Sequence, residues 1–241
     1  MTEPVLLDFI VQAWNAWAPE QSCYEHGGLV VSQIDTALIG AIVPKLMQRR
    51  LSPLAKGVFT AAQYCIAADK TSPIVFSSAH GEVNKALQML KEIQNGDELS
   101  PTAFSLSVHN AISGLISIAY RKHQEIMVIA PGQDGIAPAF IEALGILQEY
   151  ADSVVIVFYD EPLGDFYPSL PFALSAANSC ALAIKIALHG DGLPLQLCSS
   201  PDVRDDGEHA VQIVAFLNFL AAEEQFIQLG NHRHSWIWRK K

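Results

Sequence analysis

Short apolar runs alternate with amphipathic stretches along most of the chain. The runs IVFSSA at 74–79 and VVIVFY at 154–159 are continuously apolar or small, a pattern that predicts strands buried on both faces. Weaker apolar patterns predict further strands at 5–13, 104–107, 126–130, 180–188 and 234–241. The segment at 234–241 is either an edge strand or a packed tail. The run at 180–188 is also compatible with a helix.

Helix periodicity fills the intervals between these runs. Asp35 is a plausible N-cap, Pro53 opens an alanine-rich helix, and Asp134 is a second plausible cap. Asn95-Gly96 is a stop signal for a helix over 82–93. Two more helices are predicted, at 108–120 and 205–222. The helix at 108–120 is apolar on nearly every side, so it should be buried.

Strands therefore alternate with helices throughout, which indicates an α/β fold with a mostly parallel or mixed sheet. No internal repeat or linker divides the chain, so residues 1–241 are predicted to form one domain. The stretches rich in Pro, Gly and Asp, at 160–171 and 189–207, are interpreted as loops. Asp160 and Glu161 are accordingly placed in a solvated turn.

Composition narrows the function classes. Half of the 241 residues are hydrophobic, 17% are charged, and the formal net charge is -10, which excludes a disordered chain and argues against nucleic-acid binding. No apolar stretch is long enough to span a membrane, and the N-terminus lacks a basic signal-peptide region. The cysteines are expected to be buried free thiols of a cytoplasmic protein: Cys23, Cys65, Cys180 and Cys198.

Common catalytic motifs are absent. The sequence has no GxGxxG, no GxxxxGK[ST] and no GxSxG, and its histidines form no metal-binding pattern, so neither a cofactor nor a metal is expected. Ser77 and Ser78 precede His80, which leaves open an acyltransferase or hydrolase that uses one of these serines or Ser113. That alternative is disfavoured because the close sequence spacing makes it difficult for His80 to face Ser78 across an active site.

Three segments carry a family resemblance: QRRLSPLAKGVFTAAQYC, LSPTAFSLSVHNAISGLISIAY and DSVVIVFYDEPL. The chain resembles the β-ketoacyl synthase-like N-terminal family, and within it the half-length, chain-length-factor-type subunits of aryl polyene polyketide synthases. The resemblance implies one N-terminal-type half of a thiolase-like fold, with a mixed five-stranded sheet and helices. It also aligns the nucleophile position with Ala111, which has no thiol, and implies that the catalytic histidines belong to a C-terminal half that this chain lacks.

The resemblance then implies a non-catalytic partner of a full-length ketosynthase, in a heterodimer or a larger assembly, with acyl carrier protein engaged indirectly through that partner. The strand at 104–107 would pair across the dimer axis, and the partner interface would contain Phe104, Leu106, Val108, His109 and Asn110. The acyl tunnel would be lined by His80, Val83 and Leu87, although an ordinary core role explains Val83 and Leu87 equally well and a loop or cap role explains His80 slightly better. A stand-alone acyl-binding module is a third alternative.

Overall fold

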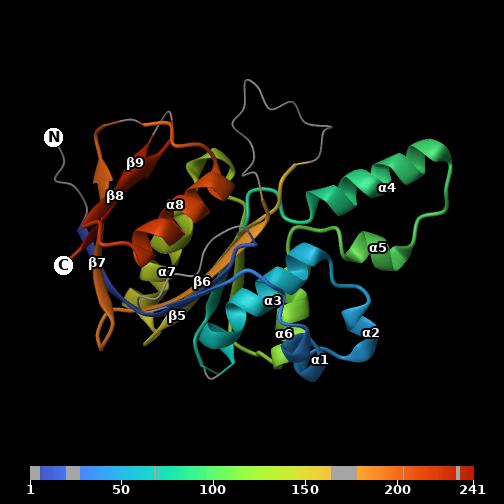
Figure 1. Cartoon of the computed structure of the whole chain (residues 1–241), viewed down its shortest axis with the longest axis horizontal. Coiled ribbons are helices and arrows are strands. Elements are labelled where there is room, and N and C mark those ends of the chain that lie inside the picture. Colours follow the sequence, from blue (N-terminus) through green and yellow to red (C-terminus); the bar gives the residue numbers. More distant parts are fainter. Residues whose placement is uncertain are drawn as a thin grey trace.

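The structure is a computed structural model that describes residues 6–19, 28–67, 69, 71–163, 178–202, 204–231 and 234–241. Within these residues the chain forms one nine-stranded mixed sheet in the order β4-β3-β5-β6-β1-β7-β9-β8, with β2 paired to β1 (Figure 1). The strands are β1 (Leu6–Trp17), β2 (Gly28–Val31), β3 (Ile74–Ser77), β4 (Ile126–Ile129), β5 (Val154–Asp160), β6 (Cys180–Ala187), β7 (Leu193–Ser200), β8 (Phe226–Gly230) and β9 (Ser235–Lys240).

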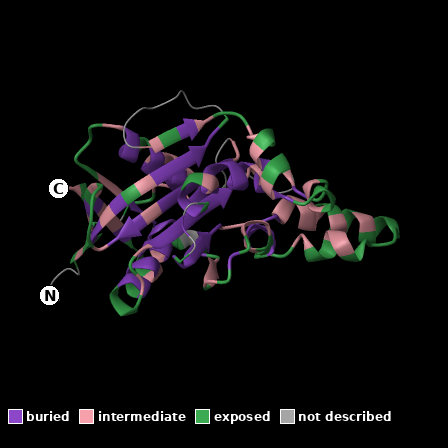
Figure 2. Ribbon diagram, turned by 90° about the horizontal axis from the view of Figure 1, so that it is seen from below, coloured by how far each residue is buried: buried purple, intermediate pink, exposed green. Residues whose placement is uncertain are grey.

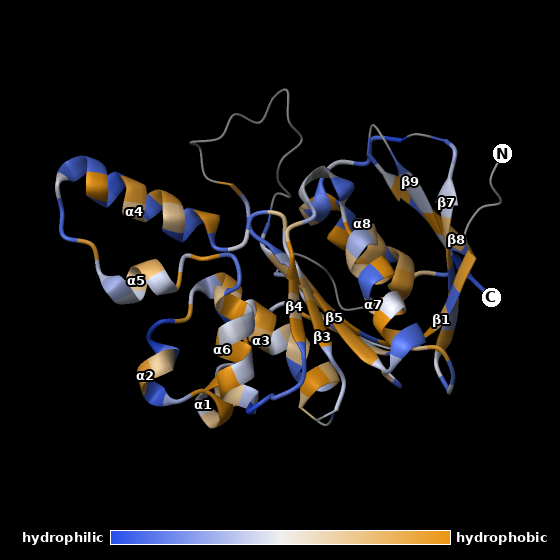
Figure 3. Ribbon diagram, turned by 180° about the vertical axis from the view of Figure 1, so that it is seen from behind, coloured by the Kyte–Doolittle hydropathy of each residue, from blue (hydrophilic) through white to orange (hydrophobic). Residues whose placement is uncertain are grey.

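Helices cover both faces of the sheet, and Figure 3 shows the two layers on either side of β3, β4 and β5. One layer contains α1 (Thr36–Ile42), α2 (Lys45–Gln48), α3 (Pro53–Ile66) and α6 (Ala111–Tyr120). The other contains α7 (Ala137–Glu149), which follows the short 3-10 helix η1 (Gly132–Asp134), and α8 (His209–Ala221). The remaining helices, α4 (Val83–Asn95) and α5 (Pro101–Ser105), extend away from the body as an arm (Figure 1).

Strand β5 is the centre of the core. All seven of its residues are buried, and alternate side chains belong to the two hydrophobic clusters on opposite faces of the sheet. Ile156 and Phe158 pack toward α7 and α8, whereas Val157 and Tyr159 pack toward α3 and α6. Buried residues accordingly concentrate in the strands (Figure 2), and the prediction of a strand buried on both faces is confirmed.

Several predicted helix ends are confirmed by their caps. The Asp35 carboxylate accepts a hydrogen bond from Leu38 N at 2.8 Å, and the Ser52 hydroxyl caps α3, with Pro53 as the first helical residue. Gly96 ends α4 in the left-handed conformation, with φ of 80°. Asp134 is not a cap: it lies in η1, and α7 begins after Ile136.

The predicted strand at 104–107 is wrong. Residues 101–105 form helix α5, because the Ser100 hydroxyl accepts from Ala103 N at 3.4 Å and Pro101 is preset for the first helical position. The predicted number of five strands is also too small, since β2, β7, β8 and β9 extend the sheet. Helix α6 begins at Ala111 rather than at 108, and it is buried on one side only, because Ile118 is 62% exposed.

Among the described residues, no helix combines the length and the apolar character that a membrane span requires.

A close contact between α3 and β1 yields a stability test. A Cβ added at Gly57 would lie 2.0 Å from the buried Trp17 ring, whereas a Cβ added at Gly114 on α6 would meet nothing within 4 Å. Gly57→Ala should therefore destabilise the fold by about 1–3 kcal/mol through overpacking. Gly114→Ala, the matched control, should stabilise it by up to about 1 kcal/mol, since alanine favours helix. Chemical denaturation measures both effects, and equal stabilities of the two variants would contradict the packing of Trp17 on α3.

Candidate functional site

A buried polar network lies where β3 and β5 end. These strands are parallel neighbours, with Ser77 opposite Phe158, so their carboxyl ends lie at the same edge of the sheet. Asp160, the last residue of β5, is fully buried and accepts hydrogen bonds from the Ser78 hydroxyl at 2.7 Å and from the backbone N–H groups of Ala79 and His80 at 3.2 Å. The prediction that Asp160 lies in a solvated turn is therefore wrong.

His209, the first residue of α8, completes the network. Its Nδ1 lies 2.5 Å from Asp160 Oδ2, and its Nε2 lies 2.8 Å from the Ser77 hydroxyl. Burial opposes ionisation of Asp160, but the His209 charge and the hydrogen bonds from His209, Ser78 and Ala79 outweigh it, so the pKa of Asp160 is lowered. The carboxylate thus ties β3, β5 and α8 together from inside the core.

The order Ser77–His209–Asp160 matches the nucleophile, base and orienting acid of a hydrolytic triad, and both distances fit. A catalytic serine must also be reached by its substrate. All three residues are 0% exposed, and the Phe158 ring packs against the His209 ring with centroids 5.8 Å apart. This burial favours a structural role for the three residues.

Ser113, another serine considered as a nucleophile, lacks such a partner. Its hydroxyl donates to Asn110 O at 2.8 Å, within the first turn of α6, and its side chain is buried. This local bond occupies the hydroxyl proton, so no histidine or carboxylate among the described residues activates Ser113 as a nucleophile.

A second, partly exposed pair borders the buried network. His80 Nε2 lies 3.3 Å from Glu208 Oε2, with the two side chains 24% and 15% exposed. Burial raises the pKa of Glu208, while His80 opposes that change. Gly81, which follows His80 in the loop after β3, has a φ of 58° and lies against His109. A Cβ added at Gly81 would be 2.7 Å from His109 Nδ1. The structure thus brings the predicted tunnel residue His80 and the predicted interface residue His109 to one place.

The other predicted residues are distributed along the arm and its base. Val83 and Leu87 lie half-buried on α4, a helix with no buried residue. Phe104 and Val108 are 61% and 40% exposed. Of the remaining predicted interface residues, Leu106 lines a pocket of about 340 Å³ between α4 and α5, and Asn110 is exposed before α6. Ala111, which the resemblance aligns with the nucleophile, is the buried first residue of α6.

Strand β4 forms an open edge of the sheet in the described part of the chain, since it pairs only with β3. The carbonyl of Glu125 accepts a hydrogen bond from Ile74 N in β3, and the carbonyl of Ile129 accepts one from Ser78 N, directly after β3. Because strand residues alternate, the backbone groups of Ile126 and Val128 point to the open side. The family resemblance implied an edge strand at 104–107 followed by a buried helix at 108–120. In the structure, an edge strand followed by a buried helix is formed by β4 and α7.

The described cysteines are unsuited to nucleophilic catalysis. Burial raises the pKa of Cys65 and of Cys180 to about 12, so neither forms a thiolate at neutral pH, and Cys198 is buried in β7. Cys23 lies outside the described residues. Over the part of the chain that the structure describes, no group of three or more His, Cys, Asp and Glu side chains could hold a metal ion.

The sheet with helices on both faces defines an α/β protein, and the family model for the β-ketoacyl synthase N-terminal domain matches residues 14–239. The chain therefore belongs to the β-ketoacyl synthase N-terminal domain family. No curated protein matches the sequence.

Two solved structures show the same thiolase-like ketosynthase fold. The chain is similar to a chain in the complex of the ketosynthase ApeO with its chain length factor ApeC from Xenorhabdus doucetiae, with 22% identity, a TM-score of 0.77, and coverage of 97% of this chain and 99% of that chain. It also resembles a β-ketoacyl synthase from Burkholderia phymatum STM815, with 8% identity and a TM-score of 0.50, over 76% of this chain and 59% of that one.

The buried network makes stability depend on pH. Because the pKa of Asp160 is lowered on folding, its contribution is complete above the unfolded pKa of about 3.9 and is lost as pH falls through the folded pKa. Asp160→Asn should destabilise the protein by about 1–3 kcal/mol at pH 7, since the amide replaces one acceptor oxygen by a donor and leaves buried donors of the network unsatisfied. The gap between variant and wild type should narrow on acidification below about pH 4. Urea denaturation of both proteins at several pH values measures this stability difference. A variant as stable as wild type at pH 7 would contradict the stabilising role of the Asp160 carboxylate.

Proposed function

We propose that the chain is a non-catalytic, chain-length-factor-like partner of a full-length β-ketoacyl-ACP synthase. Together the two subunits would complete the acyl tunnel for aryl polyene synthesis, a type II polyketide pathway akin to fatty-acid synthesis. The observation that carries this proposal is a ketosynthase-family fold in which neither candidate nucleophile position contains a cysteine, and in which burial raises the pKa of Cys65 and of Cys180. The fold likeness to a chain of a ketosynthase and chain length factor complex supports it.

The nucleophile position itself supports a non-catalytic role on either assignment. If it lies at the start of α6, as the resemblance implies, Ala111 fills it. If it follows the edge strand, at the junction of β4 and α7, the residues are Gly132, Gln133 and Asp134. Neither place contains a cysteine, and a condensing enzyme needs a thiolate to form its acyl intermediate.

The proposed partner surface combines the open edge of β4 with the base of the arm. The four residues of β4 are apolar and half-buried, and such an uncovered edge favours pairing with another strand. His109 Nε2 lies 3.4 Å from Ile129 O, so the segment from Val108 to Asn110 adjoins the end of β4. Exposed Phe104 and Val108 add the apolar area typical of a stable interface.

The tunnel assignment is part of the same proposal. His80 lies beside Glu208 at the partly exposed margin of the site, and Val83 and Leu87 begin the arm that follows it. A partner subunit that packs along α4 would bury these side chains and enclose an acyl chain. Carrier protein would reach the tunnel through the ketosynthase, because this chain carries a net charge of -10 and the acidic carriers of such systems would be repelled by it.

The first test targets the edge of β4. Val128→Pro removes a backbone N–H that points outward, which an edge strand tolerates, and should abolish co-purification with the ketosynthase. Val128→Ala is the matched control, because it trims the side chain but keeps the N–H and should still assemble. Circular dichroism confirms that both variants fold. Undiminished co-purification of a folded Val128→Pro variant would show that β4 is not paired in the complex.

The triad geometry keeps a hydrolase or acyltransferase as the second candidate, and a stand-alone acyl-binding module as the third. An exposure of 0% predicts that Ser77 performs no chemistry. Incubation of the purified chain with acyl thioesters should therefore give no turnover above that of Ser77→Ala, checked by thiol release. Turnover that disappears in a folded Ser77→Ala variant would establish a hydrolase, whereas acyl binding by the isolated chain without turnover would favour the binding module.

A further inference from the structure

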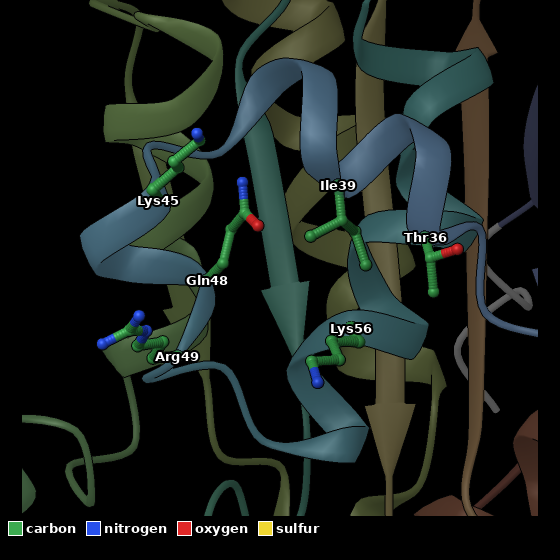
Figure 4. Close-up of a pocket in the computed structure, with 6 residues that line it drawn as sticks. All are labelled: Thr36, Ile39, Lys45, Gln48, Arg49 and Lys56. Carbon is green, nitrogen blue, oxygen red and sulfur yellow. The ribbon is translucent and has the colours of Figure 1, made fainter.

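A basic pocket lies on the helical layer that contains α1, α2 and α3, away from the network at the ends of β3 and β5. Its volume is about 490 Å³, and Figure 4 shows its six labelled side chains around the space between these helices. The lining residues are Thr36 and Ile39 from α1, Lys45 and Gln48 from α2, Arg49 just after α2, and Lys56 from α3.

The positive charge of this pocket is uncompensated. Among the described residues, Lys45, Arg49 and Lys56 form no ion pair, and no acidic side chain lines the pocket. Some cationic side chains elsewhere do have partners: Lys85 pairs with Glu82, and Lys185 pairs with Asp69. Three cations without an ion pair thus line one hollow of a protein whose net charge is -10.

The neutral lining residues suit a small oxyanion. The Gln48 amide donates one N–H to Val43 O at 2.7 Å, which fixes the side chain and leaves its second N–H available. The Thr36 hydroxyl is a further donor, and Ile39, at 5% exposed, is a buried apolar part of the lining. A site with ammonium, guanidinium, amide and hydroxyl donors and no carboxylate matches the acceptor oxygens of a phosphate.

We propose that this pocket binds the phosphate or diphosphate group of a small molecule. Its volume falls within the range of small-ligand sites, roughly 300–1,000 Å³. A bound dianion would be attracted by the three cations, while the buried Ile39 side chain would contact an apolar part of the ligand. The proposal does not rest on the partner role, since no residue of the pocket belongs to the proposed interface.

Calorimetric titration of the full chain, in whichever assembly it purifies, tests the site with two probes. Inorganic pyrophosphate and a nucleoside diphosphate present the same group from different sources. Pyrophosphate should bind with one site per chain, and Arg49→Gln and Lys56→Gln should each weaken binding about tenfold or more, through loss of a charge-assisted hydrogen bond. Tighter binding of the nucleoside diphosphate would indicate that the site also holds the organic part, and equal binding that it recognises the anion alone.

Lys91→Gln is the matched control. Lys91 is exposed on α4, so this variant removes the same charge outside the pocket and should change affinity by less than about twofold. No binding of either probe at millimolar concentration would overturn the proposal, as would equal weakening by all three variants. Capture of an acidic protein through Arg49 and Lys56, without any binding of pyrophosphate, would also overturn it and would identify a protein-docking patch instead.

Discussion

The structure depends on one buried carboxylate. Asp160 ends the most deeply buried strand of the sheet and accepts hydrogen bonds from the loop after β3 and from the first residue of α8. An unpaired charge at this depth would strongly destabilise the fold, so its donors have to remain in place. The carboxylate therefore fixes where β3 ends, where α8 begins, and how the loop that contains His80 and Gly81 approaches His109.

The same network shows why the geometry of a triad is insufficient for catalysis. Ser77, His209 and Asp160 have the spacing of a reactive serine, yet the full burial that strengthens their hydrogen bonds also closes the hydroxyl to substrate. His209 is separated from Ser77 by 132 positions, so no local motif could have predicted the network. The available signal was Asp160 itself, a carboxylate directly after six continuous apolar or aromatic positions.

Much of the fold could be predicted where local signals were strong. The continuous apolar runs identified β3 and β5, and Pro53 and the Asn95-Gly96 signal located helix ends. Residues 104–107 were misassigned because four positions are too few to establish a period, and the Ser100-Pro101 cap decides for helix. Strand β7 was missed since Pro194 and Gln196 interrupt its apolar alternation, and only pairing with β1 and β9 establishes it as a strand.

These features together explain the high apolar content of the chain, half of all residues. The two core clusters account for the buried share, but Phe104, Val108 and Ile118 remain exposed, and β4 presents four apolar residues on an open edge. Strand edges of monomeric proteins are usually protected by charge, proline or a covering element. In the described part of this ketosynthase-family fold, an unprotected edge therefore lies next to exposed aromatic and aliphatic side chains. Apolar side chains at such an edge are the residues that a covering strand or subunit would bury, which accounts for the part of the apolar content that the two core clusters leave exposed.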